Sequence, residues 1–240
     1  MLTLYSFGPS ANSLKPLLTL YEKGLDFESR YLNPARFEQH EDWFKQINPN
    51  AQAPALDHDG RIITESTVIC EYLEDLFPGT PRLRPEDPYQ RAQMRIWTKW
   101  VDEYFCWCVS TIGWERRISG IARSVSEEEF ERLVARIPLK EQQLKWRNAR
   151  NGFDKKVLEE EMRKIDYSVK KLEARLSQSP WLAGDSYTLA DICNFAIAHT
   201  MDSGFPELIN PQATPHILDW LARIRERPAC RTMYANAPVR

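Results

Sequence analysis

The sequence of 240 residues lacks any long apolar run. No stretch approaches the roughly 20 apolar residues that a membrane-spanning helix needs. The first five residues also lack the charged start and the apolar core of a signal peptide. We therefore expect no membrane insertion and no secretory leader, and residues 2–6 are predicted to form the first strand.

The chain also lacks an excess of one charge. It has 32 basic and 34 acidic residues, for a formal net charge of −2. Proteins that bind nucleic acid or anionic membranes usually carry a basic patch. This balance therefore argues against nucleic acid as a partner.

The cysteines lack the spacing of metal sites and redox motifs. Their number is odd, and no pair is separated by two residues: Cys70, Cys106, Cys108, Cys193 and Cys230. Cys106 and Cys108 are two apart on a predicted helix, so they point about 200° apart and cannot share a metal. We expect reduced thiols, no metal site and a cytoplasmic protein.

Short strands and helices alternate in the N-terminal third, in the order βαβαββα. The predicted strands are 2–6, 27–32, 55–56 and 61–64, and the predicted helices are 14–23, 36–46 and 66–77. Asn12 and Ser13 are expected to cap the first helix, which ends at Gly24, with Pro16 in its first turn.

A proline-rich segment follows and predicts a domain boundary. Residues 78–88 hold four prolines, which is typical of a linker. We predict a domain over 1–78, a linker over 79–88 and an all-helical domain over 89–240.

Helical patterns continue to the C-terminus. Helices are expected at 89–119, 126–137, 154–178, 188–201 and 214–227, the fourth opened by the capping box Thr188–Asp191. The charged segment 115–152 could cap a pocket or be a solvated insertion. Its charges favour the insertion, and its apolar positions leave the question open.

The run from Asn48 to Ser66 is the most informative part of the sequence. A loop ends in Gln52-Ala53-Pro54, a hairpin follows, and Glu65-Ser66 opens a helix. The Ala53–Pro54 bond is a candidate for the cis form, which would turn the Ala53 N–H and C=O outward to pair with a peptide. Unpaired N–H groups at a helix N-terminus suit a carboxylate. These are the two ends of a groove for a small peptide, at a junction of two domains where small ligands commonly bind.

This arrangement resembles the cytosolic glutathione transferases. The N-terminal half looks like their thioredoxin-like domain, and Asn48-Pro49 and Gln52-Ala53-Pro54 with Glu65-Ser66 look like their glutathione-binding signature. Ala51 departs from the glycine that the family often has there. The fold class implied is an α/β thioredoxin-like domain followed by an all-α domain.

A narrower resemblance is to the bacterial glutathione-dependent β-etherases of lignin breakdown. The segments that carry it are residues 5–16, 37–44, 64–75 and 97–114. They are most similar to the group that acts on the β(S) ether and is related to fungal nitrogen-regulator-like transferases. The resemblance implies a homodimer in which glutathione thiolate displaces the aryloxy group of an α-keto β-aryl ether, releasing a phenol such as guaiacol.

The resemblance also implies roles for individual residues on the glutathione side. The Ser13 hydroxyl, supported by Asn12, would donate to the thiolate, although both residue types are also ordinary helix caps. Ser66 would hold the γ-glutamyl carboxylate and Glu65 its ammonium group. The Ala53 backbone, before Pro54, would pair with the cysteinyl unit. Gln52 and His40 are candidates for the glycyl carboxylate, but a lone histidine in a short helix is more often a surface residue.

The aromatic ether would meet an aromatic stripe on the first helix of the second domain. Helical spacing places Trp97, Trp100, Tyr104 and Trp107 in one broad stripe, with Trp114 further along. Flat rings suit a two-ring substrate, but such stripes are more often core.

Two other functions compete with the etherase. One is a general glutathione transferase or a glutathione-dependent disulfide reductase, and the other is a non-catalytic glutathione-binding protein. The intact set of Gln52, Pro54, Glu65 and Ser66 argues against the non-catalytic protein. A catalytic cysteine is disfavoured, because Ser10, Asn12 and Ser13 occupy the positions where one would stand.

Overall fold

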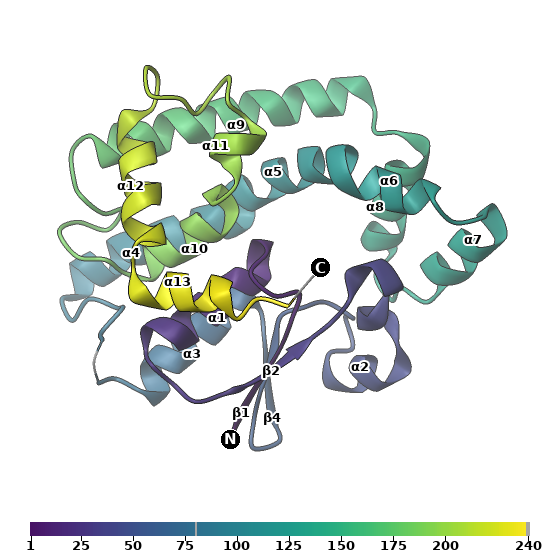
Figure 1. The fold of residues 1–240 in the computed structure, drawn as a ribbon, viewed down its shortest axis with the longest axis horizontal. Coiled ribbons are helices and arrows are strands. Elements are labelled where there is room, and N and C mark those ends of the chain that lie inside the picture. Colours follow the sequence, from purple (N-terminus) through teal and green to yellow (C-terminus); the bar gives the residue numbers. More distant parts are fainter. Residues whose placement is uncertain (80, 239–240) are drawn as a thin grey trace.

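A four-stranded sheet organises the N-terminal part of the chain, in a computed structural model that describes residues 1–79 and 81–238 (Figure 1). Its strands are β1 (Leu2–Ser6), β2 (Glu28–Tyr31), β3 (Ala55–His58) and β4 (Arg61–Thr64). They lie in the order β2-β1-β3-β4. The β1–β2 pair is parallel, and the β1–β3 and β3–β4 pairs are antiparallel.

Helices cover both faces of this sheet. The segments are α1 (Ala11–Glu22), η1 (Pro34–Arg36), η2 (Glu38–His40), α2 (Asp42–Ile47) and α3 (Ser66–Leu76). Leu4 joins the large core with α1 and α3, whereas its neighbour Tyr5 packs with Phe44 of α2. Successive strand residues point to opposite faces, which explains this division. The predicted order βαβαββα is confirmed.

The start of α1 differs from the prediction. Ser10 is the N-cap residue and the helix begins at Ala11, so Asn12 and Ser13 lie inside the first turn instead of capping it. Pro16 consequently lies beyond the first turn, where a proline removes the N–H that would bond to the Asn12 carbonyl.

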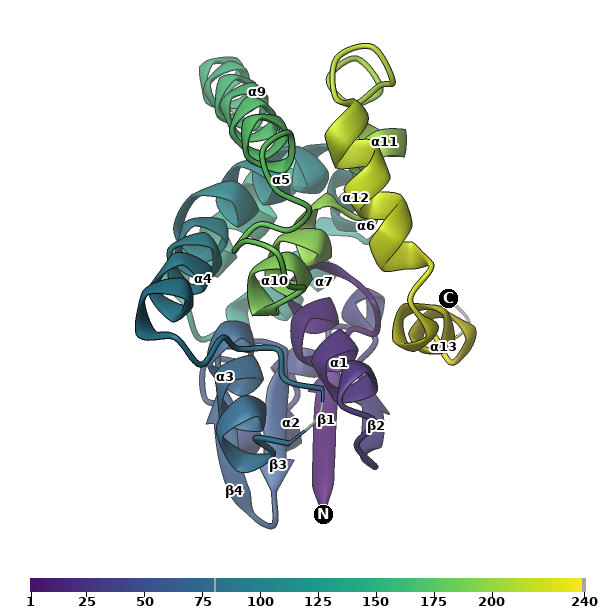
Figure 2. The same ribbon diagram turned by 90° about the vertical axis from the view of Figure 1, so that its left-hand side faces the viewer.

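The rest of the chain is helical. Its segments are α4 (Pro88–Trp100), η3 (Val101–Phe105), α5 (Cys106–Gly113), η4 (Trp114–Ile118), α6 (Ser119–Arg123), α7 (Glu127–Ala135), α8 (Lys140–Asn151), α9 (Lys155–Leu176), α10 (Leu189–Ala198), α11 (Met201–Gly204), α12 (Pro215–Arg225) and α13 (Pro228–Ala235). The helix α10 is buried and lies between α4 and α1, which ties the two halves together (Figure 2). The predicted capping box from Thr188 to Asp191 is confirmed.

Two longer helices, α8 and α13, were missing from the sequence prediction, as were the short helices α6 and α11. The helix α8 is strongly charged, so its apolar pattern is weak, and only Trp146 and Ala149 are buried. The helix α13 begins with Pro228 at its first position, which is a favoured start for a helix and could have been recognised.

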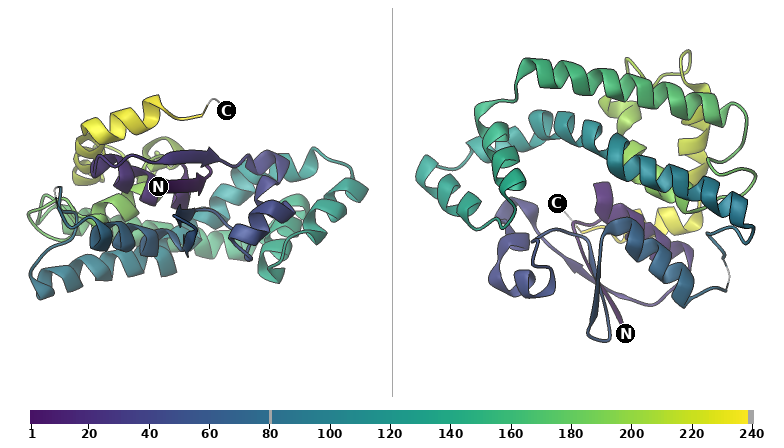
Figure 3. Two further views of the ribbon diagram at one scale, coloured as in Figure 1. Left: turned by 90° about the horizontal axis from the view of Figure 1, so that it is seen from below. Right: turned by 180° about the vertical axis from the view of Figure 1, so that it is seen from behind.

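The interpretation of residues 115–152 as only a solvated insertion is wrong. Phe130, Leu133, Val134 and Ile137 recur at helical spacing and form a small core with Trp146 and Ala149. The N-terminal domain contributes Phe37, whose ring centroid lies 4.4 Å from that of Trp146. The charged segment therefore docks α7 and α8 beside η2 and α2 (Figure 3). The segment therefore has a buried apolar face as well as its charged side chains.

All five cysteines are free thiols. Within residues 1–79 and 81–238, no helix is both long and apolar enough to cross a membrane.

We predict that Trp146→Ala destabilises the chain far more than Leu144→Ala on the same helix. Trp146 is 5 % exposed and fills the small core, whereas Leu144 is 59 % exposed. Truncating a buried tryptophan typically costs about 3–5 kcal/mol, and an exposed leucine costs about 0.5 kcal/mol or less. Urea unfolding measures the two costs, and hydrogen exchange of α7 and α8 locates the loss. Equal losses in the free energy of unfolding of the two variants would contradict the packing of α7 and α8 around Trp146.

Candidate functional site

The strand register brings the predicted glutathione-binding segments to one end of the sheet. Ala55 pairs with both Tyr5 and Thr64. The loop after β1, the Gln52–Pro54 loop before β3 and the start of α3 after β4 therefore emerge side by side. The end of β2 joins them, because Tyr31 pairs in parallel with Ser6. The sequence motifs thus converge through strand pairing.

The N-terminus of α3 offers unpaired donors. Glu65 precedes it with φ 65° and ψ 115°, a strained backbone for a residue with a side chain. Among the described residues, no side chain caps this helix, and the buried Thr67 Oγ1 has no hydrogen-bond partner. Ser66, at the first helical position, is largely buried. Helix N-termini with free N–H groups bind carboxylates, so this end fits the γ-glutamyl carboxylate of glutathione.

The loop before β3 has the expected geometry. The Ala53–Pro54 bond is cis. The Gln52 carbonyl accepts a hydrogen bond of 2.7 Å from Asn48 Nδ2, which fixes the conformation of the loop. Ala51 has φ 54°, in the left-handed region that favours glycine. It therefore replaces the family's glycine at a position whose backbone conformation glycine adopts with less strain.

The first turn of α1 carries the predicted thiolate donors. The Ser13 Oγ is buried and accepts a hydrogen bond of 3.0 Å from the Phe7 N–H. None of the described residues accepts the proton of the Ser13 hydroxyl in return. A hydroxyl that already accepts one hydrogen bond is polarised to donate another, so Ser13 is able to donate to a thiolate.

Asn12 faces the helical domain. Its Oδ1 accepts a hydrogen bond of 3.6 Å from the Cys106 thiol of α5. Burial raises the pKa of Cys106, which keeps it a neutral thiol. Three residues beyond Asn12, the fully buried Lys15 ammonium pairs with Asp102 of η3. The first turn of α1 is therefore covered by the segment from η3 to α5.

His40 is buried, so the alternative that it is only a surface residue is wrong. Its Nε2 lies 3.1 Å from Gln39 Nε2, and its Nδ1 has no partner within the described part of the chain. Burial, followed by the positive charges of Arg136 and Lys45, lowers the pKa of His40 to about 4. His40 is therefore neutral at neutral pH and could reach a glycyl carboxylate only as a neutral donor.

Trp97, Trp100 and Tyr104 lie together as predicted, with the rings of Trp100 and Tyr104 stacked and their centroids 6.4 Å apart, but Trp107 departs from this stripe. Trp97 and Trp100 pack edge to face, and the Lys171 ammonium of α9 lies over both rings. Tyr104 packs against Tyr167, also on α9.

Trp107 and Trp114 instead lie beside Lys145 of α8, with ring centroids 5.7 Å and 4.8 Å from Nζ. The five-residue π-helical segment η3 between Trp100 and Trp107 breaks the α-helical period. The substrate roles of all these rings stay predictions.

Lys145 and Cys106 are two residues of this region that sequence analysis missed. Cys106 was considered only as a metal ligand or disulfide partner, and Lys145 lies on the unpredicted helix α8. The spacing of apolar residues in segment 115–152 was the only sequence signal that pointed to a packed helix there, and so to Lys145. Among the described residues, no three side chains gather to bind a metal.

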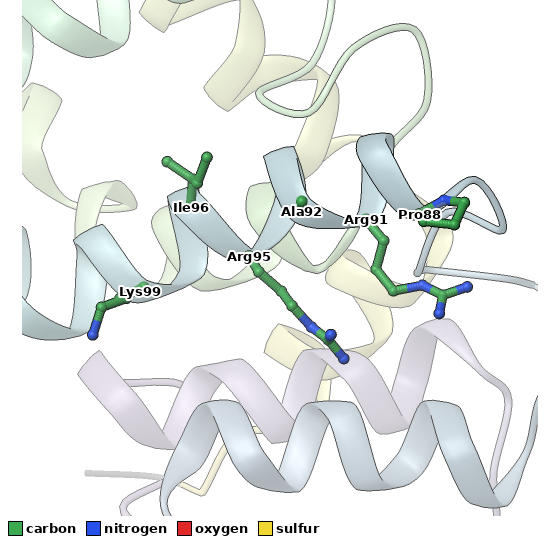
Figure 4. A pocket seen from close by; sticks show the side chains of 6 residues that line it. All are labelled: Pro88, Arg91, Ala92, Arg95, Ile96 and Lys99. Atoms are coloured by element: carbon green, nitrogen blue, oxygen red, sulfur yellow. The ribbon is translucent and has the colours of Figure 1, made fainter.

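A surface hollow lies elsewhere, along α4. It measures about 360 Å³ and is lined by Pro88, Arg91, Ala92, Arg95, Ile96 and Lys99 (Figure 4). None of the predicted glutathione residues lines it.

Comparison with known proteins identifies the family. The family model for the glutathione S-transferase N-terminal domain matches residues 1–75, and the model for the C-terminal domain matches residues 125–228. The chain is a glutathione transferase. Glutathione is therefore its co-substrate, and the resemblance read from the sequence is confirmed. The domain boundaries at 78 and 88 stay a prediction.

Individual relatives of this glutathione transferase agree with that assignment. Protein LigF from Sphingobium sp. strain SYK-6 is 58% identical over 241 residues, which cover 98% of this chain and 94% of LigF. The crystal structure of the β-etherase LigF matches with a TM-score of 0.96 over 98% of both chains. Glutathione S-transferase GstB from Escherichia coli K12 is 26% identical over 96% of both chains.

We predict that His40 makes the transferase less stable in acid. The unfolded histidine titrates near 6.5, and the folded one near 4. Between these values the unfolded chain binds a proton that the folded chain does not, so stability falls as the pH falls. The wild type should lose about 2 kcal/mol more than His40→Gln between about pH 7 and about pH 5, measured by urea unfolding. If the free energy of unfolding depended on pH in the same way in both proteins, protonation of His40 would not destabilise the fold and the prediction would be wrong.

Proposed function

We propose that this glutathione transferase is a glutathione-dependent β-etherase that acts on lignin-derived α-keto β-aryl ethers. The observation that carries the proposal is the 58% identity to the β-etherase LigF over 98% of the chain. The glutathione end of the sheet supports it, because the cis-Pro54 loop and the open N-terminus of α3 lie beside the first turn of α1.

The reaction is a nucleophilic substitution. The glutathione sulfur attacks the carbon that bears the aryloxy group, which the adjacent ketone makes more electrophilic. The carbon–oxygen bond breaks, a phenol such as guaiacol leaves, and a β-glutathionyl thioether remains. The β(S) enantiomer is the proposed substrate, following the resemblance seen in the sequence.

Binding and activation of glutathione fall to different residues. Ser66 and the N–H groups of α3 hold the γ-glutamyl carboxylate, and Glu65 holds the ammonium group. The Ala53 backbone pairs with the cysteinyl unit, and Gln52 and His40 are the residues proposed for the glycyl carboxylate. Ser13, with Asn12 beside it, donates to the thiolate.

An unperturbed thiol has a pKa of about 8.5, so little of free glutathione is a thiolate at neutral pH. Positive potential at the N-terminus of α1 adds to the effect of Ser13 and favours the anion.

We further propose a cytoplasmic homodimer. The α3–α4 face exposes Val68, Tyr89 and Ile96, at 54%, 72% and 55% exposure. Arg95 of α4 joins this face by pairing with Glu71 of α3 at 2.9 Å. Exposed apolar side chains on neighbouring helices are typical of an interface, and two-fold dimers are the commonest oligomers. Sedimentation equilibrium decides between monomer and dimer.

We predict that the chain, given glutathione and a racemic α-keto β-aryl ether dimer, releases phenol until about half of the ether is consumed. One enantiomer should remain, because a chiral site holds only one in line for attack. Phenol release and chiral chromatography of the remaining ether measure this outcome. Activity on a generic aryl halide or a small disulfide, without phenol release, would favour a general transferase or a reductase instead.

We predict that two serines separate binding from activation. Ser66→Ala should raise the KM for glutathione about tenfold with little change in kcat, because a hydrogen bond to a charged group contributes about 1.5–3 kcal/mol. Ser13→Ala should lower kcat by a similar factor and raise the pKa of the bound thiol. Steady-state kinetics and thiolate absorbance provide the two measurements. An unchanged thiol titration in Ser13→Ala would remove Ser13 from the mechanism.

A further inference from the structure

Lys145 of α8 reaches across to α5. Its Nζ donates a hydrogen bond of 2.9 Å to the Ser110 Oγ. The ammonium also lies over the rings of Trp114 and Trp107, at 4.8 Å and 5.7 Å from their centroids. Aromatic faces attract cations, so these contacts hold the ammonium in a fixed place between α8 and α5.

The charge of Lys145 is not neutralised nearby. Among the described residues, no carboxylate lies within 4.0 Å of its Nζ. The two fully buried lysines differ, because Lys15 pairs with Asp102 and Lys23 with Glu74. Burial lowers the pKa of Lys145 to about 8, although Cys106 of α5 and Glu161 of α9 act in the opposite direction. Glu161 is itself paired with Lys164. Lys145 is thus a partly buried cation with a readily transferred proton and no anionic partner.

Lys145 lies close to the place of the reacting sulfur. Cys106 and Ser110 are four residues apart on α5, so they share one face of the helix, about 6 Å apart along its axis. Cys106 contacts Asn12, beside the proposed thiolate site, and Ser110 contacts Lys145. One turn of α5 therefore separates the attacking sulfur from the ammonium.

We propose that the Lys145 ammonium binds the ether oxygen of the substrate and protonates the departing aryloxide. This inference rests on the proposed etherase function. In a displacement at carbon, the nucleophile and the leaving group lie on opposite sides of the reacting atom. The turn of α5 between Cys106 and Ser110 provides that separation, with Ser13 and Asn12 at the sulfur and Lys145 at the oxygen.

The step conserves atoms and charge. The thiolate electron pair forms the sulfur–carbon bond, and the electron pair of the carbon–oxygen bond moves to the aryloxide oxygen. The Lys145 proton passes to that oxygen, which yields the neutral phenol and a neutral amine. The amine then takes up the proton that glutathione released to solvent when it became a thiolate.

The acidity of Lys145 suits this transfer. A phenol titrates near 10, so a proton moves downhill from an ammonium whose pKa is about 8. Catalytic acids work best when their pKa lies near the working pH. Trp107 and Trp114 supply flat faces beside the oxygen site on which a departing aryl ring can stack.

The test compares two ether substrates that differ only in the leaving phenol. One releases a methoxyphenol, and the other releases a nitrophenol, whose much more stable anion needs no acid. Lys145→Met should lower kcat/KM for the methoxyphenyl ether about 100-fold, the magnitude typical of general acid catalysis. For the nitrophenyl ether the loss should be about threefold or less. Lys145→Arg keeps the charge but holds its proton too tightly, so it should also be slow on the methoxyphenyl ether.

Lys140→Met, at an exposed position on the same helix, is the matched control and should retain activity on both ethers. Circular dichroism compares the folds, and Lys145→Gln provides a second variant if Lys145→Met does not fold. Equal losses on the two ethers, or no loss on either, would overturn the role of Lys145. A wild-type protein that releases neither phenol, yet transfers glutathione to an aryl halide, would overturn the etherase function itself.

Discussion

The ion pair between the buried Lys15 ammonium and the partly exposed Asp102 carboxylate is the contact on which the arrangement of the site depends. A fully buried ammonium is costly unless a carboxylate meets it, so removing Asp102 would leave the Lys15 ammonium buried without its anionic partner. The pair fixes η3 against α1. Asn12 lies three residues before Lys15, and Cys106 lies four residues after Asp102, so the same crossing brings these two into contact. This charge pair and the helical repeat therefore align the two domains at the thiolate site, in addition to the packing of α10 between α4 and α1.

A second contact extends the site from the N-terminal domain in another direction. Phe37 packs on Trp146, and Arg136 forms an ion pair with Glu41 at 2.7 Å. These contacts hold α7 and α8 beside η2, which carries His40, and α8 in turn presents Lys145 to α5. The small core around Phe37 thus connects the glutathione end of the sheet to the helix proposed to serve the leaving group.

The sequence predicted the N-terminal domain well, because its signals are local. Glycine and proline mark its turns, the strands are short and alternating, and Gln52 to Ser66 form a compact signature. Strand pairing then brought the motifs together. The helical domain was harder to predict, since the position of Trp107 depends on a π-helical segment that no composition signal announces. Lys145 was missed because α8 buries only Trp146 and Ala149 and offers little periodicity. The burial of His40 depends on segment 115–152, which packs beside it although it is distant in sequence. The residues next to His40 in the chain therefore give no sign of it.

The π-helical segment η3 also has a consequence for how such proteins diversify. A π-helical turn holds one more residue than an α-helical turn, so deleting a single residue between Val101 and Phe105 would restore a regular helix without breaking it. The helix after that point would keep its orientation, because five π-helical residues turn through nearly the same angle as four α-helical residues. Trp107 and Ser110 would keep their present partners, and only side chains within η3 would change neighbours. A one-codon change could thus exchange the η3 side chains beside the first turn of α1 in one step, while α5, the sheet, the glutathione loops and the fold stayed as they are.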